Sequence, residues 1–310
     1  MSLMLEVKNL YKKFNGLKAV EDLSFTVHEK DVYGFLGQNG AGKSTTIRML
    51  LTLVKPSAGE ITIFGKELVS NRNEILRQTG AMIERPDLYK YLSAYDNLAI
   101  FAKMSGVKVT RKLVMDQLDM VGLADRSNSK IKTFSQGMKQ RLGIAVALIH
   151  DPRLIILDEP TNGLDPQGIA DMRNLILHLS RQRGKTVIVS SHLLSEIELI
   201  ANRMIIIHKG KKVSEGVVAE MLDPSHTIVM IETTNNELAI QELATLGWAA
   251  KLSATDRLIQ LTINKSEIPK LVTTLTAKNI GIIALQPRHS LEEYFLSLTN
   301  TEAHVESVTD

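Results

Sequence analysis

The stretch Gly37-Gln38-Asn39-Gly40-Ala41-Gly42-Lys43-Ser44 decides how this sequence folds. It fits the pattern G-x-x-x-x-G-K-[ST], in which glycines allow successive backbone N–H groups to turn toward a phosphate. The apolar residues Val32–Leu36 before it predict a strand, and Ser44–Val54 after it have helical spacing. The positive N-terminal end of that helix would face the same phosphate. The sequence therefore predicts a nucleotide-binding loop between a strand and a helix.

Two side chains of this loop and two later carboxylates indicate how the site would bind phosphates, hold Mg²⁺ and activate water. Lys43 supplies a positive charge for the β- and γ-phosphates, and the hydroxyl of Ser44 is a ligand for Mg²⁺. The apolar run Leu154–Leu157 predicts a buried strand that ends in Asp158 and Glu159. Asp158 is placed to hold Mg²⁺ through water, and Glu159 to polarise the water that attacks the γ-phosphate. The alternative is a strand that merely ends in a charged turn.

Strand and helix signals alternate along the first part of the chain. Leu3–Asn9 and Val20–His28 alternate apolar and polar residues, which predicts half-buried strands. Helices are predicted over Gln136–Ile149 and Asp171–Gln182, with a buried strand over Thr186–Ser190 after the second. This order indicates a parallel α/β sheet with some antiparallel strands at the start.

The charge of the chain changes sign near the turn-forming triplet Asp223-Pro224-Ser225. The residues up to Ser225 include 31 basic and 24 acidic side chains, whereas the rest include 6 basic and 10 acidic ones. We therefore predict one domain over residues 1–222, a second over residues 226–298, and a flexible tail over residues 299–310. The second domain reads as strand, helix, two strands, helix and strand, which is the ferredoxin-like βαββαβ pattern. A short helix is predicted at its end, over Ser290–Leu298.

The composition excludes several classes of function. The chain has no cysteine, which excludes a disulfide scaffold, a thiol nucleophile and a Cys-ligated metal. A net charge of +3 gives no support for a nucleic-acid partner. No stretch approaches the ~18 apolar residues of a membrane span, and the N-terminus lacks the apolar core of a signal peptide. We expect a protein that works in the cytosol, or at the inner membrane surface through another protein.

A third motif lies between the two phosphate-site elements. Thr133-Phe134-Ser135-Gln136-Gly137-Met138-Lys139-Gln140-Arg141-Leu142 resembles the signature motif of ATP-binding-cassette (ABC) ATPases, whose usual form is LSGGQ. Residues 158–166, Asp-Glu-Pro-Thr-Asn-Gly-Leu-Asp-Pro, and residues 190–192, Ser-Ser-His, also match that family. The resemblance covers Met1 to about Leu222. It implies an ABC-type cassette of the phosphate-loop NTPase fold, with antiparallel β and helical subdomains.

The resemblance also implies a role for each matching residue. Phe14 would stack on adenine, although a core aromatic is the alternative. Ser135 and Gly137 would contact the γ-phosphate held by a second subunit, and Asp165 would lie at the dimer interface. The implied nucleotide-binding residues are Phe14, Gly37, Gln38, Asn39, Gly40, Ala41, Gly42, Lys43, Ser44, Thr45, Ser135, Gly137 and Asp165. The implied catalytic residues are Lys43, Glu159 and His192, the last of which would reach the γ-phosphate. The implied cofactors are ATP and Mg²⁺.

Two positions depart from the family pattern. Gln136 replaces a signature glycine, and its side chain would crowd the approach to the partner phosphate or add an amide contact. Glu84 stands where the family places a glutamine that touches Mg²⁺. A carboxylate is a stronger ligand for a hard cation than an amide oxygen. The predicted metal ligands are therefore Ser44, Asp158 and Glu84, and we expect Glu84 to tighten metal binding and to alter the rate of hydrolysis.

These features resemble the ATPase subunits of exporters for bacitracin, lantibiotics and drugs. The resemblance implies an ATP-hydrolysing subunit that powers export through separate membrane permease subunits at the cytoplasmic face of the membrane. One set of motifs per chain implies a homodimer or a heterodimer with a related ATPase. Two alternatives remain: a soluble ABC ATPase that acts on ribosomes, DNA or cluster assembly, and a regulator whose C-terminal domain senses a ligand.

Overall fold

The chain forms two compact units, Met1–Val218 and Ala219–Asp310, which are considered separately. The structure is a computed structural model, and it describes residues 2–84, 86–221, 227–245, 247–248, 250–252 and 258–288. Within this part of the chain, no helix is both long and apolar enough to cross a membrane. The predicted boundary triplet Asp223–Ser225 lies outside these residues, and the predicted domain limits stay predictions.

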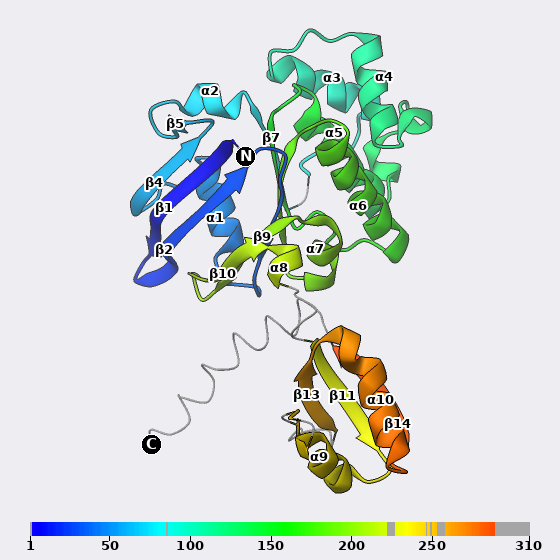
Figure 1. Cartoon of the computed structure of the whole chain (residues 1–310). Helices are drawn as coiled ribbons and strands as arrows, with labels where there is room; N and C mark the ends of the chain where they lie inside the picture. Colours follow the sequence, from blue (N-terminus) through cyan, green and yellow to red (C-terminus); the bar gives the residue numbers. More distant parts are fainter. Residues whose placement is uncertain are drawn as a thin grey trace. The chain divides into compact units, whose positions relative to one another are not determined.

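A six-stranded sheet forms the centre of the first unit (Figure 1). Its strand order is β10-β9-β3-β8-β7-β6, and all neighbours pair in parallel except β10, which is antiparallel to β9. The strands are β3 (Val32–Leu36), β6 (Thr79–Ile83), β7 (Leu154–Asp158), β8 (Thr186–Ser191), β9 (Arg203–His208) and β10 (Lys211–Val217). Every residue of β3, β7 and β8 is buried. The near-continuous apolar runs arise because both faces of a parallel sheet are covered.

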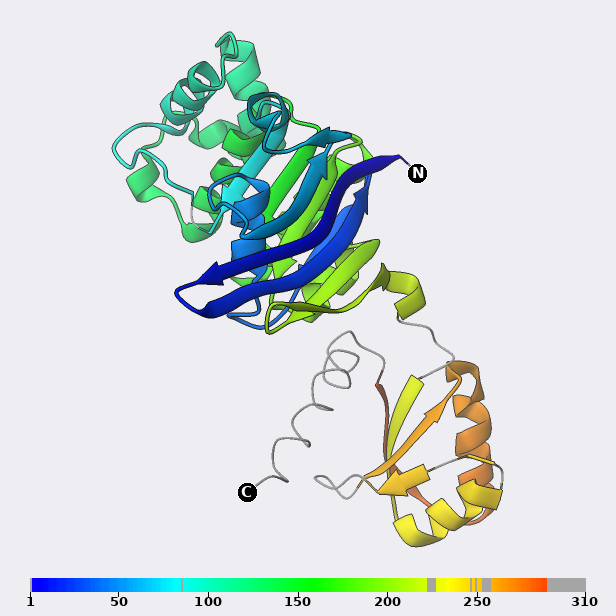
Figure 2. The same ribbon diagram turned by 90° about the vertical axis from the view of Figure 1, so that its left-hand side faces the viewer.

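An antiparallel sheet covers α1 (Lys43–Leu50) on the side away from the central sheet (Figure 2). Its order is β2-β1-β4-β5, with β1 (Leu3–Phe14), β2 (Leu17–His28), β4 (Ala58–Ile63) and β5 (Lys66–Glu67). Ile47, Met49 and Leu50 of α1 share one apolar core with residues of both sheets. The antiparallel strands predicted at the start of the chain are confirmed.

A buried tyrosine joins the two sheets. The hydroxyl of Tyr33 on β3 donates a hydrogen bond of 2.8 Å to Glu215 on β10, and the same carboxylate oxygen accepts from the backbone N–H of Thr26 on β2. Burial raises the pKa of Tyr33 well above its ordinary value, and the negative charge of Glu215 adds to the effect. Tyr33 therefore acts as a neutral hydrogen-bond donor inside the core.

Helices cover the other face of the central sheet and form a separate group beside it. α6 (Pro166–Arg181) packs against β3 and β8, and α7 (Leu194–Ile200) packs beside it. α6 begins at Pro166, so the predicted start at Asp171 is wrong. Asp165 caps this helix by accepting from the N–H of Gly168, and proline is well tolerated at a first helical position. The separate group is formed by α3 (Ala94–Met104) and α4 (Arg111–Met120), which pack on α5 (Gln136–Leu148).

Two glycines bring α5 and β6 into direct contact. A Cβ atom on Gly80 of β6 would lie 2.1 Å from the carbonyl oxygen of Ala147 on α5. A Cβ atom on Gly143 of α5 would lie 2.6 Å from Cβ of Pro86 and 2.8 Å from Sδ of Met82. All three separations are shorter than real Cβ contacts allow. The helix backbone therefore touches β6 directly at Gly80, and at Gly143 it leaves room only for the side chains of Met82 and Pro86.

The second unit has the predicted βαββαβ order. Its strands pair antiparallel in the order β12-β13-β11-β14, and α9 and α10 bury one apolar core against the sheet. The elements are β11 (Thr227–Thr233), α9 (Asn236–Thr245), β12 (Ala250–Leu252), β13 (Ile259–Ile263), α10 (Ile268–Ala277) and β14 (Ile282–Arg288). The ferredoxin-like topology is confirmed. The helix predicted over Ser290–Leu298 and the predicted tail lie outside the described residues.

Candidate nucleotide site

The loop between β3 and α1 has the backbone shape that the glycine pattern predicts. Gly40 and Gly42 have φ values of 83° and 106°, in the left-handed region that favours glycine. A Cβ atom on Gly42 would lie 2.6 Å from the carbonyl oxygen of Ala19, and one on Gly37 would lie 2.5 Å from that of Ile207. The loop is therefore enclosed by neighbouring backbone on two sides. Its tip, residues 38–40, is exposed.

Lys43 lies inside this loop. Its Nζ atom donates a 2.7 Å hydrogen bond to the carbonyl oxygen of Gly37 and lies 3.2 Å from Oε1 of Glu159. Its side chain is 5% exposed, whereas Ser44 and Thr45 after it are partly exposed. The sequence placed Lys43 and Glu159 in one site although they are far apart along the chain, and the structure brings them together.

Asp158 and Glu159 share a hydrogen-bonding partner on the neighbouring strand. The hydroxyl of Ser190 on β8 donates to Oδ1 of Asp158 at 2.5 Å, and the backbone N–H of Glu159 donates to the same hydroxyl at 3.0 Å. The parallel register sets Asp158 beside Ser190. Sequence reasoning assigned no role to Ser190, although it is the first residue of the Ser-Ser-His motif. The sequence feature that could have identified Ser190 is its position at the end of a predicted buried strand.

One oxygen of Asp158 remains available inside the site. Asp158 is fully buried, and its Oδ2 atom has no hydrogen-bond partner among the described residues. A buried acceptor without a partner is costly unless water or a cation reaches it. The carboxylate of Asp158 and the hydroxyl of Ser44, the residue after Lys43, are oxygen ligands of the kind that Mg²⁺ prefers. The donor set therefore fits a magnesium ion.

Glu159 joins the phosphate loop to His192. One carboxylate oxygen of Glu159 contacts Nζ of Lys43, and the other lies 2.7 Å from Nδ1 of His192. The backbone of Glu159 has a φ of 51°, which is uncommon for a residue with a side chain and frequent at functional sites. The side chain is 15% exposed. The structure therefore brings together Lys43, Glu159 and His192, the three predicted catalytic residues, with Glu159 ion-paired to Lys43 and hydrogen-bonded to His192.

Phe14 lies at the end of β1, on the surface. Its side chain is 42% exposed, and Nζ of Lys12 lies 4.7 Å from the centroid of its ring. The alternative of a core aromatic is therefore wrong. An exposed ring beside a cation offers a flat surface on which a planar base can stack.

Ser135, Gly137 and Asp165 lie at the N-terminal ends of α5 and α6. The hydroxyl of Ser135 accepts from the N–H of Met138, so Ser135 caps α5 as Asp165 caps α6. Ser135 and Asp165 are exposed, and Gly137 is partly exposed. Among the residues that the structure describes, no hydrogen bond or ion pair joins these three to the phosphate loop of the same chain.

Glu84 follows β6 directly and points to an unexpected partner. Its Oε1 atom lies 2.6 Å from Nη2 of Arg48 on α1, and its side chain is 61% exposed. The register pairs Ile83 with Asp158, so Glu84 lies next to the end of the strand that carries the buried carboxylate. Arg48 was not identified from the sequence, where nothing distinguishes it from other helix-surface cations.

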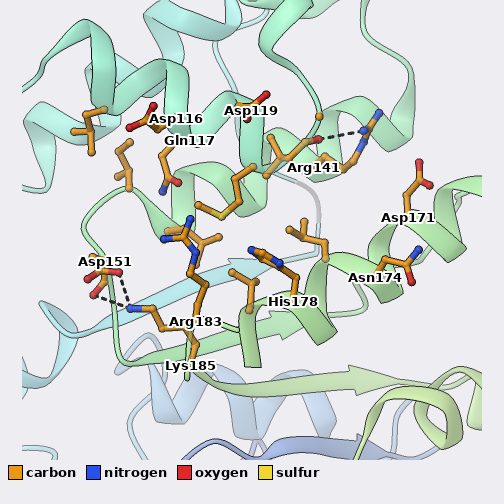
Figure 3. Close-up of a pocket in the computed structure, with 18 residues that line it drawn as sticks. Asp116, Gln117, Asp119, Arg141, Asp151, Asp171, Asn174, His178, Arg183 and Lys185 are labelled. Carbon is orange, nitrogen blue, oxygen red and sulfur yellow. Dashed lines mark hydrogen bonds and ion pairs between the residues drawn. The ribbon is translucent and has the colours of Figure 1, made fainter. Parts of the chain in front are cut away.

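A separate cavity of about 930 Å³ lies between α4, α5 and α6 (Figure 3). None of the predicted site residues lines it. Arg141 donates from its side chain to the carbonyl oxygen of Val121, and Lys185 pairs with Asp151 at 2.6 Å. The cavity is lined by charges of both signs, which gives it no preference for a ligand of one charge.

The strand, loop and helix around Lys43, with the carboxylates at the end of β7, define a phosphate-loop nucleotide-binding protein. The family model described as ABC transporter matches residues 20–162. The chain is 43% identical over 302 residues to the uncharacterized ABC transporter ATP-binding protein YhcH of Bacillus subtilis (strain 168), covering 96% of this chain and 97% of that protein. The chain belongs to the family of ABC transporter ATP-binding proteins.

Two further similarities extend this result. The chain is 50% identical over 216 residues to the bacitracin transport ATP-binding protein BcrA of Bacillus licheniformis, covering 69% of this chain and 70% of that protein. Among solved structures, the ATP-binding cassette MJ0796, a dimer in a post-hydrolysis state bound to ADP and Pi, has a TM-score of 0.63 at 26% identity. That similarity covers 69% of this chain and 99% of the other. The predicted ABC-type cassette is confirmed.

Proposed function

We propose that this chain hydrolyses ATP at the site formed by Lys43, Glu159 and His192 and thereby powers export through separate membrane permease subunits. The observation that carries the proposal is the position of the Glu159 carboxylate, between the phosphate-loop lysine and the histidine. A carboxylate in hydrogen-bond reach of a water beside the γ-phosphate can accept the proton of that water. His192 orients Glu159, and Lys43 neutralises charge on the phosphates.

Magnesium would be held by Ser44 and Asp158, with Glu84 as a third ligand. When bound there, the ion would supply positive charge that neutralises charge developing on the phosphates. Ser190 occupies Oδ1 of Asp158, which leaves Oδ2 for the metal or its bound water. This arrangement lets one residue, Ser190, position both the metal-binding carboxylate and the backbone of the general base.

The working unit would be a dimer, with the simplest partner a second copy of the chain. Ser135 and Asp165 are exposed at helix N-termini, where the positive end of a helix attracts a phosphate. They make no hydrogen bond to their own phosphate loop within the described part of the chain, which leaves them for the nucleotide of the second subunit. Phe14 would stack on the adenine of the chain's own ATP.

The exported substrate would be a peptide antibiotic or a related drug. The relative that shares half of the aligned residues is named for bacitracin transport. Export places the chain at the cytoplasmic face of the membrane, attached through its permease partners. The permease would set the choice of substrate, because the family resemblance places the membrane spans in separate polypeptides.

The variant Glu159→Gln tests the assignment of the general base. It keeps the size of the side chain but cannot accept a proton, so we expect hydrolysis to fall by about 10²–10⁴-fold while ATP binding persists. Size-exclusion chromatography with ATP should then show a stable dimer. Lys43→Ala is the contrasting variant, because it should weaken ATP binding itself. Normal hydrolysis by Glu159→Gln would show that the assignment is wrong.

The transport role is tested by isolating the chain from detergent-solubilised membranes. A co-purifying integral membrane protein that stimulates ATP hydrolysis supports the proposal. Co-purification of ribosomes or DNA in its place would favour a soluble ABC ATPase. A small molecule bound by the C-terminal unit, without a membrane partner, would favour a ligand-sensing regulator.

A further inference from the structure

The ion pair between Arg48 and Glu84 joins two elements that both lead to the proposed metal site. Nη2 of Arg48 lies 2.6 Å from Oε1 of Glu84. Arg48 belongs to α1, which begins at the phosphate loop. Glu84 follows Ile83, which lies beside Asp158 in the register of β6 and β7. The pair therefore links two elements. One is α1, which carries the proposed ligand Ser44, and the other is the end of β6, which lies beside the proposed ligand Asp158.

Helix geometry places Arg48 one turn away from Ser44. Residues four apart lie on the same face of a helix, separated by about 5.4–6 Å along it. Ser44 and Arg48 are both partly exposed, whereas Ile47 between them is fully buried. A Glu84 carboxylate paired with Arg48 is therefore held against the face of α1 that also carries Ser44.

The pair is suited to exchange with a metal ion. The side chains of Arg48 and Glu84 are 42% and 61% exposed, and ion pairs in solvent contribute little to stability. A divalent hard cation attracts a carboxylate more strongly than a guanidinium group does. Glu84 also has a φ of 54°, so the chain turns sharply where the side chain is aimed. A modest change in this turn would redirect the carboxylate.

We propose that Arg48 is a positioning residue that holds the carboxylate of Glu84 in an ion pair and so competes with the metal site for this carboxylate. Binding of Mg²⁺ with nucleotide requires the ion pair to open, so Arg48 raises the concentration of Mg²⁺ that is needed. The carboxylate is then released to the metal only when nucleotide is present. This inference rests on the proposed role of Glu84 as a metal ligand.

The test is a titration of Mg²⁺ into the full-length chain with a non-hydrolysable ATP analogue, followed by calorimetry. Arg48→Gln removes the ion pair but keeps a long polar side chain. We expect it to lower the Mg²⁺ concentration at half-saturation by about two- to fivefold, the range that corresponds to an exposed ion pair. Arg48→Lys, which keeps the charge, should restore most of the wild-type value.

The double variant Arg48→Gln with Glu84→Gln isolates the interaction between the two residues. An amide at position 84 cannot form the ion pair, so Arg48→Gln should have no further effect in that background. Lys66→Gln is the matched control, because Lys66 forms a pair with Glu74 of similar exposure, 44% and 53%, on α2 (Arg72–Leu76). It should leave the Mg²⁺ midpoint unchanged.

The outcomes separate this inference from the proposed function. If Glu84→Gln alone leaves the midpoint unchanged, the ligand role of Glu84 is wrong and the inference is overturned with it. If Glu84→Gln weakens Mg²⁺ binding but Arg48→Gln has no effect, only the role of Arg48 is overturned. An equal effect of Arg48→Gln in both backgrounds also overturns it, because Arg48 would then act without Glu84.

Discussion

Ser190 uses both hydrogen-bonding roles of one hydroxyl group at the centre of the site. It donates to Asp158 and accepts from the backbone of Glu159. A serine hydroxyl has one hydrogen to donate and lone pairs to accept with, so both bonds form at once. The proposed metal-binding carboxylate and the backbone of the proposed general base are therefore positioned by the same buried hydroxyl group.

Replacing Ser190 should separate catalysis from nucleotide binding. Ser190→Ala removes both bonds and leaves Oδ1 of Asp158 buried without its partner, which we expect to cost about 1–3 kcal/mol of unfolding free energy. ATP hydrolysis should fall, while the affinity for a non-hydrolysable analogue changes little because the phosphate loop is intact. Urea denaturation, steady-state kinetics and calorimetry measure the three quantities.

The matched control for this prediction is Ser180→Ala. Ser180 is 8% exposed, and its hydroxyl donates to the carbonyl oxygen of Lys30, away from the site. It should lower stability without lowering the turnover number. If the two variants had the same turnover number as the wild type, Ser190 would have only a structural role.

Among the individual residues, the sequence identified those in motifs but not the side chains that position them. Lys43 and Glu159 were identified from local spacing, and His192 was identified through the family resemblance. Ser190 and Arg48 were missed because their partners, Asp158 and Glu84, are set by strand register and side-chain direction. Spacing along one chain does not determine which side chain from another element will reach a carboxylate. The same limit applies to Glu84, whose contact with Arg48 no motif indicates.

Among the elements, the contact between α5 and β6 depends on glycine. Because Gly143 lies against Met82 and Pro86, an added methyl group has no free space. Gly143→Ala should therefore destabilise the protein by about 1–3 kcal/mol through overpacking, despite the better helix propensity of alanine. Thermal or urea unfolding measures the change.

Gly137→Ala on the same helix is the control for unfolding free energy. A Cβ atom there would lie 3.7 Å from Cδ2 of Leu164, which is an ordinary contact. Gly137 lies in the first turn of α5, so its variant shows what a Gly-to-Ala change does on this helix where the added methyl group has room, and a lower stability of Gly143→Ala reports the packing against β6. Equal stabilities would show that Pro86 and Met82 move aside at no cost.

Buried elements were predicted better than exposed ones. The strands β3, β7 and β8 are buried throughout, and the sequence runs that predicted them match their bounds closely. The start of α6 was placed too late because its first turn is exposed and lacks apolar periodicity. The signal that identifies it is Asp165 followed by Pro166, a cap and a first-turn proline. Short elements such as β5 and α2 carry too few residues for any periodicity.

For the whole molecule, the division into two units predicts two unfolding events. Each unit has its own apolar core, and only the first contains the nucleotide site. A ligand that binds one folded unit stabilises that unit by about 2.7 kcal/mol at a hundredfold excess over its dissociation constant. Differential scanning calorimetry of the intact chain should show one transition that rises with Mg²⁺ and the ATP analogue, and one that stays fixed.

The variant Lys43→Ala provides the control for this experiment. Because this variant should bind the analogue weakly, the temperatures of both unfolding transitions should stay unchanged at the same analogue concentration. A single transition that shifts as a whole in the wild type would show that the two units unfold together. The chain would then be one cooperative unit in unfolding, and the predicted division into two domains would be wrong in this respect.

The glycine contacts between α5 and β6 couple the positions of these two elements. The paired positions, Gly80 with Ala147 and Met82 with Gly143, show that the helix runs opposite to the strand. Ser135 at the start of α5 and Glu84 after β6 therefore both lie toward the same end of this helix–strand pair. Because these close contacts couple the two elements, a displacement of Ser135 on binding the nucleotide of a second subunit would also displace the turn that carries Glu84.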